Sequence, residues 1–316
     1  MEKTWGFARM SILADKPTRD EWTMTSQARK TQNMCKTVLS RFDDWLKLKG
    51  TTEELFFDAM RGANESQRAS TVRDIQNYWL ETVKSRSAQT YRSVLIMWFE
   101  ENGCPIPQSK LRRFARLPKP EVPLKYTPSK KEVAALINTI AKQSEGIDVY
   151  ADQGKYYKLF FTLLSCTSMR HGELLEVKGE HIDLDQRSIR IPASQTKTRR
   201  ERVAFFTPQA KKMLTALDFF IFPEMKLFRL HQSSYQYQID QARKKLGIFK
   251  TEKDWTMHRL RAWCSQVIKD NTNYEFGELM LGHTAGNKTY DHNVSKWKKL
   301  YDKAVPDLTL ELEDKA

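Results

Sequence analysis

The spacing of apolar side chains predicts helices along the first third of the chain. In residues 88–103, apolar residues recur at i, i+3, i+4, i+7 and i+8 of one helical face: Tyr91, Val94, Leu95, Trp98 and Phe99. Gly103 then offers a left-handed C-terminal cap. Residues 70–85 repeat the pattern with Val72, Ile75, Trp79 and Val83. We therefore expect a small helical bundle over about residues 21–102.

Proline interrupts the helical pattern. Four prolines fall within eleven positions from Pro118 to Pro128, which excludes a regular helix or central strand, and Lys119 and Lys125 lie among them. This composition predicts an extended, basic linker between two domains. The expected parts are a flexible arm, a helical domain, the linker, a second domain and a tail, at residues 1–20, 21–115, 116–128, 129–305 and 306–316.

The second domain mixes element types. Ser129 and Glu132 form a capping-box pattern that predicts a helix start. A later apolar stretch indicates two helices with a break near Thr167 and Ser168. Short alternating or β-branched runs at 182–185, 188–194 and 200–206 predict a small antiparallel sheet, and helical patterns resume from about residue 208. The expected fold class is mainly α with a small antiparallel β-sheet.

Charge suggests a polyanionic partner. The chain has 53 Lys and Arg against 39 Asp and Glu, a formal net charge of +14. Residues 1–120 carry 21 basic and 14 acidic side chains, and residues 121–316 carry 32 and 25, so each part contributes +7. Such a distribution is expected if both domains contact one duplex, and solubility alone is the alternative explanation of the excess.

Other features exclude several classes of protein. The four cysteines, at 35, 104, 166 and 264, show no CxxC and no zinc-ligand spacing, so we expect reduced, mostly buried thiols and no metal. No stretch approaches the roughly 18 apolar residues of a membrane helix. The N-terminal MEKTWGFARM lacks the apolar core of a signal peptide, which predicts a cytoplasmic protein without membrane contact. With the basic excess, we expect it to be DNA-associated.

Four short stretches hold the candidate catalytic side chains. They are TSMRHGELLEV with Arg170, ASQTKTRRERVAFF with Lys197, MHRLRAW with His258 and Arg261, and LGHTAGNKTYDHN with His283 and Tyr290. Each alone has an ordinary structural interpretation. Arg170 suits a helix start, Lys197 a solvated turn, and Tyr290 a half-buried aromatic.

Together, in this order, the stretches resemble the tyrosine recombinase family, the phage-integrase type of site-specific recombinases. TSMRHGELLEVKGEHIDLD is similar to the family's first arginine motif, T-G-x-R-x-x-E-L-x-x-L-x-x-x-D-I-D, and MHRLRAW and MLGH resemble its H-x-L-R and L-G-H. The resemblance covers most of residues 128–305, and the closing KKLYDKAVPDLTL resembles archaeal-type integrases. The resemblance to tyrosine recombinases implies a C-shaped clamp of a helical core-binding domain and an α+β catalytic domain.

The resemblance assigns a role to each residue. Arg170 and Arg261 would hold the non-bridging phosphate oxygens, for which planar guanidinium forks are suited. His258 and His283 would donate hydrogen bonds there, and His258 is also a candidate base for the tyrosine proton. Lys197 would protonate the leaving 5′ oxygen, and Tyr290 would attack. Because this stabilisation is electrostatic, neither a metal nor another cofactor is expected. Glu173 would orient the basic groups, and the expected DNA contacts are Arg199, Arg200, Lys119 and Lys125.

One spacing departs from the family pattern. The nucleophile usually lies about nine residues after the L-G-H histidine, whereas Tyr290 lies seven after His283. A loop shortened by two residues would account for this, since TYDHN is similar to the family's x-Y-T-H-x. Tyr301, in a helical stretch, is the competing nucleophile.

The resemblance also implies partners. These are duplex DNA with a specific recombination site, a homotetramer on that DNA, and accessory DNA-bending proteins. The expected activity is cleavage and rejoining of DNA through a 3′-phosphotyrosyl intermediate, without ATP. A type IB topoisomerase-like activity, a telomere resolvase and a non-catalytic DNA-binding regulator remain as alternatives. The tail would either dock on a neighbouring protomer or fray.

Overall fold

The chain divides into two compact units, residues 1–123 and 124–316, here called unit 1 and unit 2. A computed structural model describes residues 18–25, 29–119, 126–144, 153–196, 199–216, 223–248, 255–283 and 294–313. The division falls inside the stretch for which the sequence predicts a Pro-rich linker. Each unit has its own apolar core.

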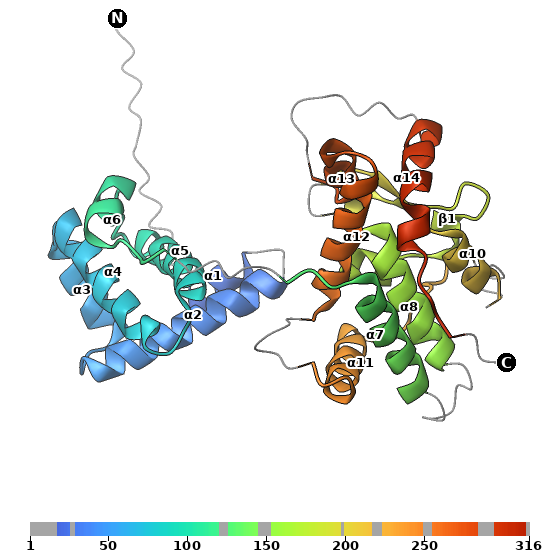
Figure 1. Ribbon diagram of the computed structural model, residues 1–316. Helices are drawn as coiled ribbons and strands as arrows, with labels where there is room; N and C mark the ends of the chain where they lie inside the picture. The colour runs from blue at the N-terminus through green and yellow to red at the C-terminus, as the bar shows by residue number, and fades with distance from the viewer. Residues whose placement is uncertain are drawn as a thin grey trace, which may run out of the picture. The chain divides into compact units, whose positions relative to one another are not determined.

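Unit 1 is helical in its described residues (Figure 1). Its helices are α1 (Arg19–Met24), α2 (Arg29–Leu48), α3 (Glu53–Gly62), α4 (Glu65–Leu80), α5 (Ser85–Glu101) and α6 (Gln108–Phe114). Because α1 begins at Arg19, helix already occupies the end of the segment expected to be a flexible arm. The stripe predicted on α5 packs inward, with Val94, Leu95, Trp98 and Phe99 buried.

Aromatic rings dominate the core of unit 1. Phe42, Phe56, Phe57 and Phe99 meet mostly edge to face, with the rings of Phe56 and Phe57 centred 5.1 Å apart. Full burial of one such side chain contributes about 1.5–3 kcal/mol, and edge-to-face geometry adds about 0.5–1.5 kcal/mol per pair. This core unites α2, α3 and α5.

Helix α5 ends at the predicted glycine cap. Gly103 has φ of 72°, its N–H donates to Glu100 O at 3.0 Å, and the next N–H, of Cys104, donates to Phe99 O at 2.8 Å. These two bonds form a Schellman motif, which satisfies carbonyls that the helix end leaves without partners.

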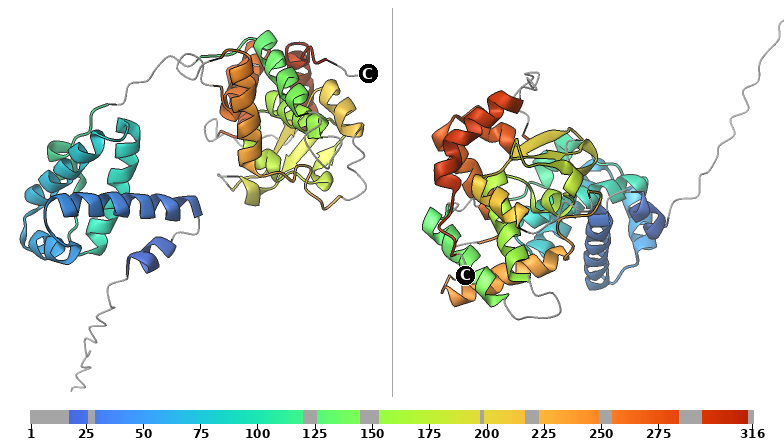
Figure 2. Two further views of the ribbon diagram at one scale, coloured as in Figure 1. Left: turned by 90° about the horizontal axis from the view of Figure 1, so that it is seen from below. Right: turned by 90° about the vertical axis from the view of Figure 1, so that its right-hand side faces the viewer.

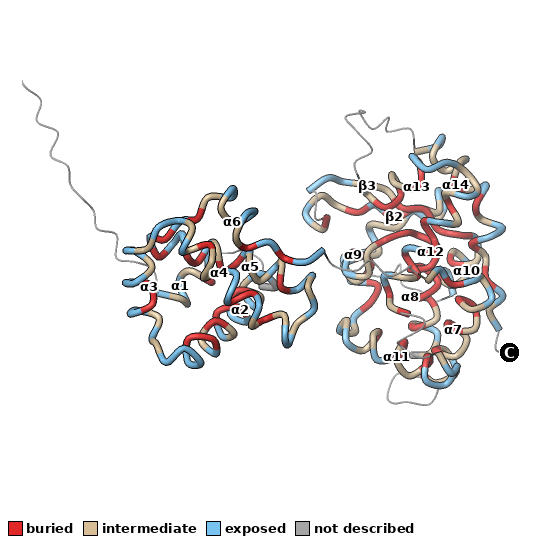
Figure 3. The backbone as a smooth tube through the Cα atoms, turned by 60° about the vertical axis from the view of Figure 1, so that its left-hand side comes forward, coloured by how far each residue is buried: buried red, intermediate tan, exposed pale blue. Residues whose placement is uncertain are grey.

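Unit 2 combines helices with one small sheet. Its helices are α7 (Lys130–Gln143), α8 (Gln153–Thr167), α9 (His171–Leu175), α10 (Pro208–Thr215), α11 (Gln232–Lys245), α12 (Met257–Asn271), α13 (Tyr274–Met280) and α14 (Val294–Leu308). The Ser129 and Glu132 capping box at the start of α7 is formed as predicted. Helix α8 packs against α7, α10 and α12, and buried residues run along α8 and α12 (Figure 3).

The sheet has three antiparallel strands in the order β1 (Ile182–Asp183), β2 (Ser188–Ile191) and β3 (Arg202–Phe205), which confirms the predicted mainly α fold with a small antiparallel sheet. Ile189 lies opposite Ala204 in the sheet, and both are buried. The next residue, Arg190, is exposed and forms an ion pair with Glu201. The strands lie beside α8 (Figure 2). Lys197 falls in the sequence between β2 and β3.

The end of the chain docks on its own unit. Helix α14 extends through Pro306 to Leu308, so the expected boundary at 305 falls inside a helix. Beyond it, Leu310 is buried, and its backbone N–H and C=O bond reciprocally to the Gln209 side chain, at 3.1 and 2.7 Å. The described part of the tail is therefore ordered on its own unit, and docking on a neighbouring protomer stays a prediction.

The four cysteines are buried and free, as predicted. Burial raises the pKa of Cys166 to about 11 and that of Cys264 to about 12, so neither is a reactive thiolate at neutral pH. Among the described residues, none of the helices is long and apolar enough to cross a membrane.

Candidate active site

Arg170 lies where the chain turns from α8 into α9. Ser168 takes a left-handed conformation, with φ of 54°, and its hydroxyl donates to Cys264 Sγ at 3.1 Å, which ties the turn to α12. Two residues later Arg170 occupies the cap of α9, where its N–H donates to Glu173 Oε2 and its guanidinium to Oε1, both at 2.8 Å. The predicted helix break is thus the feature that directs Arg170.

Glu173 joins three guanidinium groups from three elements. Its carboxylate contacts Arg170 at 2.8 Å, Arg202 of β3 at 2.5 Å and Arg261 of α12 at 3.8 Å, and its side chain is 3% exposed. Burial would raise the pKa of Glu173. The charge of Arg202 and the hydrogen bonds from Arg170 outweigh burial, so the pKa lies below its ordinary value. Glu173 therefore holds a cluster of positive charge at a fixed place.

Arg261 is the most enclosed of the three. Its Nη2 donates to Leu281 O at 2.6 Å, whereas its Nη1 is buried without a hydrogen-bond partner among the described residues. Burial lowers the pKa of Arg261 to about 10, and the neighbouring charges of Arg170 and Arg202 act in the same direction. The guanidinium remains charged at neutral pH, with one donor nitrogen unused among the described residues.

The L-G-H turn brings His283 to the same place. Gly282 has φ of 67°, and a Cβ built on it would lie 2.8 Å from Arg202 Cδ. Only glycine fits both the left-handed backbone and this close approach. The turn is a Schellman motif, with the His283 N–H donating to Glu278 O at 3.0 Å and that of Gly282 to Leu279 O at 2.8 Å.

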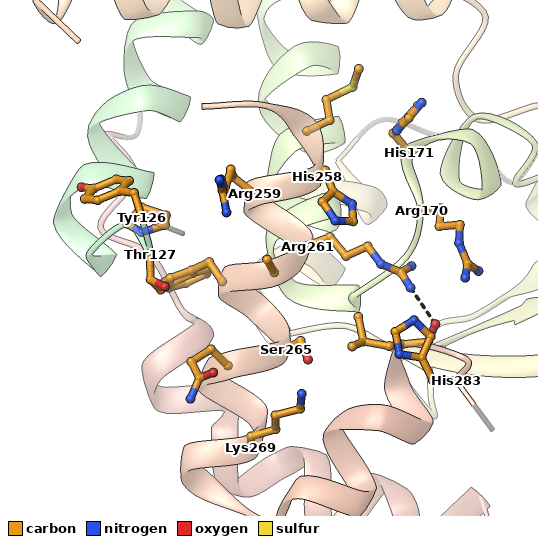
Figure 4. A pocket seen from close by; sticks show the side chains of 16 residues that line it. Tyr126, Thr127, Arg170, His171, His258, Arg259, Arg261, Ser265, Lys269 and His283 are labelled. Atoms are coloured by element: carbon orange, nitrogen blue, oxygen red, sulfur yellow. Dashed lines mark hydrogen bonds between the residues drawn. The ribbon is translucent and has the colours of Figure 1, made fainter. Parts of the chain in front are cut away.

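Four of the six predicted catalytic side chains line one pocket of unit 2, with a volume of about 550 Å³. Arg170 comes from the α8–α9 turn, His258 and Arg261 from one face of α12, and His283 from the L-G-H turn (Figure 4). Tyr126, Arg259, Ser265 and Lys269 also line it. A concave site with several cations converging on it suits an anionic substrate.

Three predicted residues lie outside the described residues: Lys197, Tyr290 and Lys125. Arg199 and Arg200, between β2 and β3, are exposed, and so is Lys119 at the end of the described part of unit 1. All three cations are therefore accessible to solvent, and their contact with DNA stays a prediction.

Known proteins resemble this chain in both sequence and fold. A family model described as "Phage integrase family" matches residues 129–296. The chain belongs to the phage integrase family. A curated relative, tyrosine recombinase XerA of Saccharolobus solfataricus, is 33% identical over 127 residues, which span 40% of this chain and 41% of the relative. The sequence match thus covers less than half of that relative's length.

Two solved phage-integrase-type structures are similar in fold. One is the XerH site-specific recombinase in a post-cleavage complex with palindromic difH substrate, with a TM-score of 0.58, 16% identity, and coverage of 85% of this chain and 75% of that one. The other is a lambda integrase tetramer bound to a Holliday junction, with a TM-score of 0.50, 20% identity, and coverage of 82% and 80%. At these identities the similarity concerns the fold.

Tyr301 of this phage integrase family member is not accessible as a nucleophile. Its side chain is 1% exposed, it packs on Phe205, and its hydroxyl donates to Cys166 O at 2.7 Å. Burial raises the pKa of Tyr301 well above its ordinary value, which disfavours the phenolate. Tyr301 is therefore a core residue, and the role of the competing Tyr290 stays a prediction.

Sequence reasoning missed Arg202. Its place in a β-branched run predicts only a strand residue, but its guanidinium bonds to Glu173 and donates to Met280 O at 2.8 Å, so it connects β3 with the L-G-H turn. No local pattern in the sequence singles out Arg202, because Glu173 and Met280 lie 29 and 78 positions away along the chain.

Proposed function

We propose that this protein is a site-specific DNA recombinase that cleaves and rejoins duplex DNA through a 3′-phosphotyrosyl link to Tyr290. The observation that carries the proposal is the pairing of Arg170 and Arg261 through the buried Glu173, beside two histidines in one pocket. A metal-free phosphoryl-transfer site needs several fixed cations of this kind.

The charges suit the transition state. Attack of a tyrosine on a phosphodiester places extra negative charge on the non-bridging oxygens, and guanidinium forks bind such oxygens in a bidentate way. Arg261 stays charged at neutral pH, and its Nη1, which has no hydrogen-bond partner in the described parts of the chain, is a donor that a phosphate oxygen would satisfy. Because the site is partly buried, each contact is stronger than it would be in water.

The proposed reaction requires no ATP. The Tyr290 oxygen forms a bond to phosphorus, its proton passes to His258 or to water, and the bond from phosphorus to the 5′ oxygen breaks. Lys197 supplies the proton that turns this oxygen into a free 5′-OH. A 5′-OH of a second DNA strand reverses the attack and restores a phosphodiester, so the bond energy is kept.

The partners follow from the relatives. The XerH relative is bound to its difH substrate and the lambda integrase relative is a tetramer bound to a Holliday junction. For this protein we propose duplex DNA with a specific site, and a homotetramer as the assembly that exchanges strands. Both units contribute to the net positive charge, which favours phosphate contacts from each.

A nicked suicide duplex tests the proposal. Bound sequences are first selected to find the site, and the protein is then incubated with a duplex nicked near the cleavage position. We expect a covalent protein–DNA adduct that resists denaturation, is lost in Tyr290→Phe, and persists in Tyr301→Phe. Loss of the adduct in Tyr301→Phe but not in Tyr290→Phe would reverse the assignment. Absence of an adduct on every selected DNA would refute the recombinase function.

A further inference from the structure

One acidic side chain holds both a lysine and the L-G-H histidine beside the pocket. Glu278 of α13 receives Lys269 Nζ on Oε1 at 2.5 Å and His283 Nδ1 on Oε2 at 2.7 Å. Lys269 and His283 line the pocket, and Glu278 is not among its lining residues. These three residues are here called the Lys269–Glu278–His283 cluster. The family resemblance assigns a role only to the histidine.

The lysine has a built position. A Cβ on Gly277 would lie 2.2 Å from Lys269 Cγ, so the lysine side chain passes where any other residue at 277 would begin. Its Nζ lies 4.5 Å from the centre of the Tyr274 ring, a cation–π contact. The backbone of α13 and the aromatic ring therefore hold the ammonium group on Glu278.

The carboxylate determines where the histidine carries its proton. Burial would raise the pKa of Glu278, but hydrogen bonds from Lys269 and His283 lower it below its ordinary value, so the group is ionised at neutral pH. An ionised carboxylate only accepts hydrogen bonds. Nδ1 of His283 must then carry a proton whether the ring is neutral or charged, and proton exchange is confined to Nε2, on the opposite side of the ring.

We propose that Glu278 is a positioning residue that keeps the His283 proton on Nδ1, so that Nε2 is the nitrogen that meets the scissile phosphate, and that Lys269 locks Glu278 in this role. The inference rests on the proposed function for the identity of the phosphate. The tautomer itself is a property of the protein alone, which allows the two to be tested apart.

Glu278→Gln gives the sharpest test. The glutamine amide has one acceptor oxygen and one donor nitrogen. Since the Lys269 ammonium can only donate, it takes the oxygen, and the amide nitrogen then faces His283 Nδ1, which must accept. We expect 15N NMR of histidine-labelled protein at alkaline pH to show protonated Nδ1 in the wild type and protonated Nε2 in Glu278→Gln. His283→Gln identifies the resonance among the six histidines.

A second substitution tests the lysine. In Lys269→Met combined with Glu278→Gln, the amide is able to turn its oxygen toward His283, and we expect protonation on Nδ1 to return at least in part. Gly277→Ala, which displaces the Lys269 side chain without changing charge, should restore it in the same background. An unchanged tautomer in Glu278→Gln, with near-wild-type circular dichroism and thermal unfolding, would overturn the proposal. So would failure of both second substitutions to restore Nδ1 protonation.

Activity supplies the functional readout. We expect Glu278→Gln to form the DNA adduct about tenfold more slowly, the scale of replacing a charge-assisted hydrogen bond by a neutral one. Glu275→Gln removes the same charge from an exposed site on α13 and should keep the wild-type rate. If no adduct forms with wild type, the recombinase function fails while the tautomer result still stands. If adduct forms equally fast in Glu278→Gln, the positioning role fails alone.

Discussion

Individual residues in this site act mainly through charge held at fixed positions. Glu173 is the clearest case, because its one carboxylate contacts guanidinium groups from the α8–α9 turn, β3 and α12. Buried carboxylates are costly unless they are paired and hydrogen-bonded. The cluster therefore exists as a unit, and removal of its central charge leaves two enclosed arginines without compensation.

Acid should weaken this cluster in a defined direction. The folded-state pKa of Glu173 lies below its ordinary value of 4.5, so its contribution to stability is complete above pH 4.5 and is lost as the pH falls through the lowered pKa. Glu173→Gln should lower stability by about 3–5 kcal/mol at neutral pH. Its stability should approach the wild-type value in acid. Urea unfolding over a pH series measures the loss of stability at neutral pH and its disappearance in acid.

The control for this prediction is Glu176→Gln. Glu176 pairs with Lys226 at 2.6 Å, but both side chains are nearly half exposed. Exposed pairs of this kind contribute about 0.2–1 kcal/mol. Equal pH dependence in the wild type and Glu173→Gln would contradict the role given to the buried carboxylate.

Gly282 permits a second test at the residue scale. Gly282→Ala introduces a side chain at φ of 67° and 2.8 Å from Arg202 Cδ, whereas Gly247→Ala does so at φ of 64° with no atom of the described residues within 4 Å. The left-handed backbone alone costs about 1–2 kcal/mol. We expect Gly282→Ala to lose more stability than Gly247→Ala in urea unfolding. Equal losses would show that Arg202 adjusts without cost.

At the scale of elements, the structure places residues 309–313 on unit 2. Leu310 is buried, the Gln209 side chain satisfies its backbone, and Glu313 Oε2 lies 2.6 Å from Lys142 Nζ on α7. The stretch after α14 thus contacts both α7 and α10. Leu310 is buried there and Leu312 packs against the same core.

Removing this anchor should loosen unit 2. Leu310→Ala deletes a buried side chain and should cost about 2–5 kcal/mol of unfolding free energy, while Leu312→Ala, at a partly buried position, should cost less. Thermal and urea unfolding of both variants measure the difference. Similar, negligible losses in both would show that the docked tail contributes no packing energy.

At the scale of the whole molecule, both units carry net positive charge, +6 for residues 1–123 and +8 for residues 124–316, and each has its own apolar core. A protein of this charge that binds DNA should release counterions. The logarithm of its binding constant should therefore fall linearly with the logarithm of salt concentration, with a slope of about −0.9 for each phosphate neutralised.

Two exposed arginines between β2 and β3 test this at single positions. Arg199→Ala and Arg200→Ala should weaken DNA binding with little dependence on sequence, and each should reduce the salt slope by about 0.9 if its guanidinium neutralises one phosphate. Lys142→Ala, which removes a cation already paired with Glu313, should leave the slope unchanged. Fluorescence anisotropy over a salt series measures it. Unchanged slopes in both arginine variants would place DNA elsewhere.

Local patterns in the sequence determined much of the architecture. The stripe from Tyr91 to Phe99, the Gly103 cap, the Ser129 capping box and the break at Ser168 depend on residues within a few positions of one another, so helical periodicity and capping chemistry suffice to predict them. The order of the arginine, histidine and L-G-H motifs likewise indicated the family and four side chains that line one pocket.

Tertiary structure alone decided which charges meet. Residues 173, 202 and 261 come together because helices and strands pack on a shared core, and no local spacing encodes the 2.5 Å contact between Glu173 and Arg202. Lys269 likewise meets Glu278 because α12 packs against α13. Tyr301 shows the same limit. Its sequence context left it a candidate nucleophile, and only burial against Phe205 and Cys166 made it a core residue. Burial and long-range electrostatics depend on the path of the whole chain.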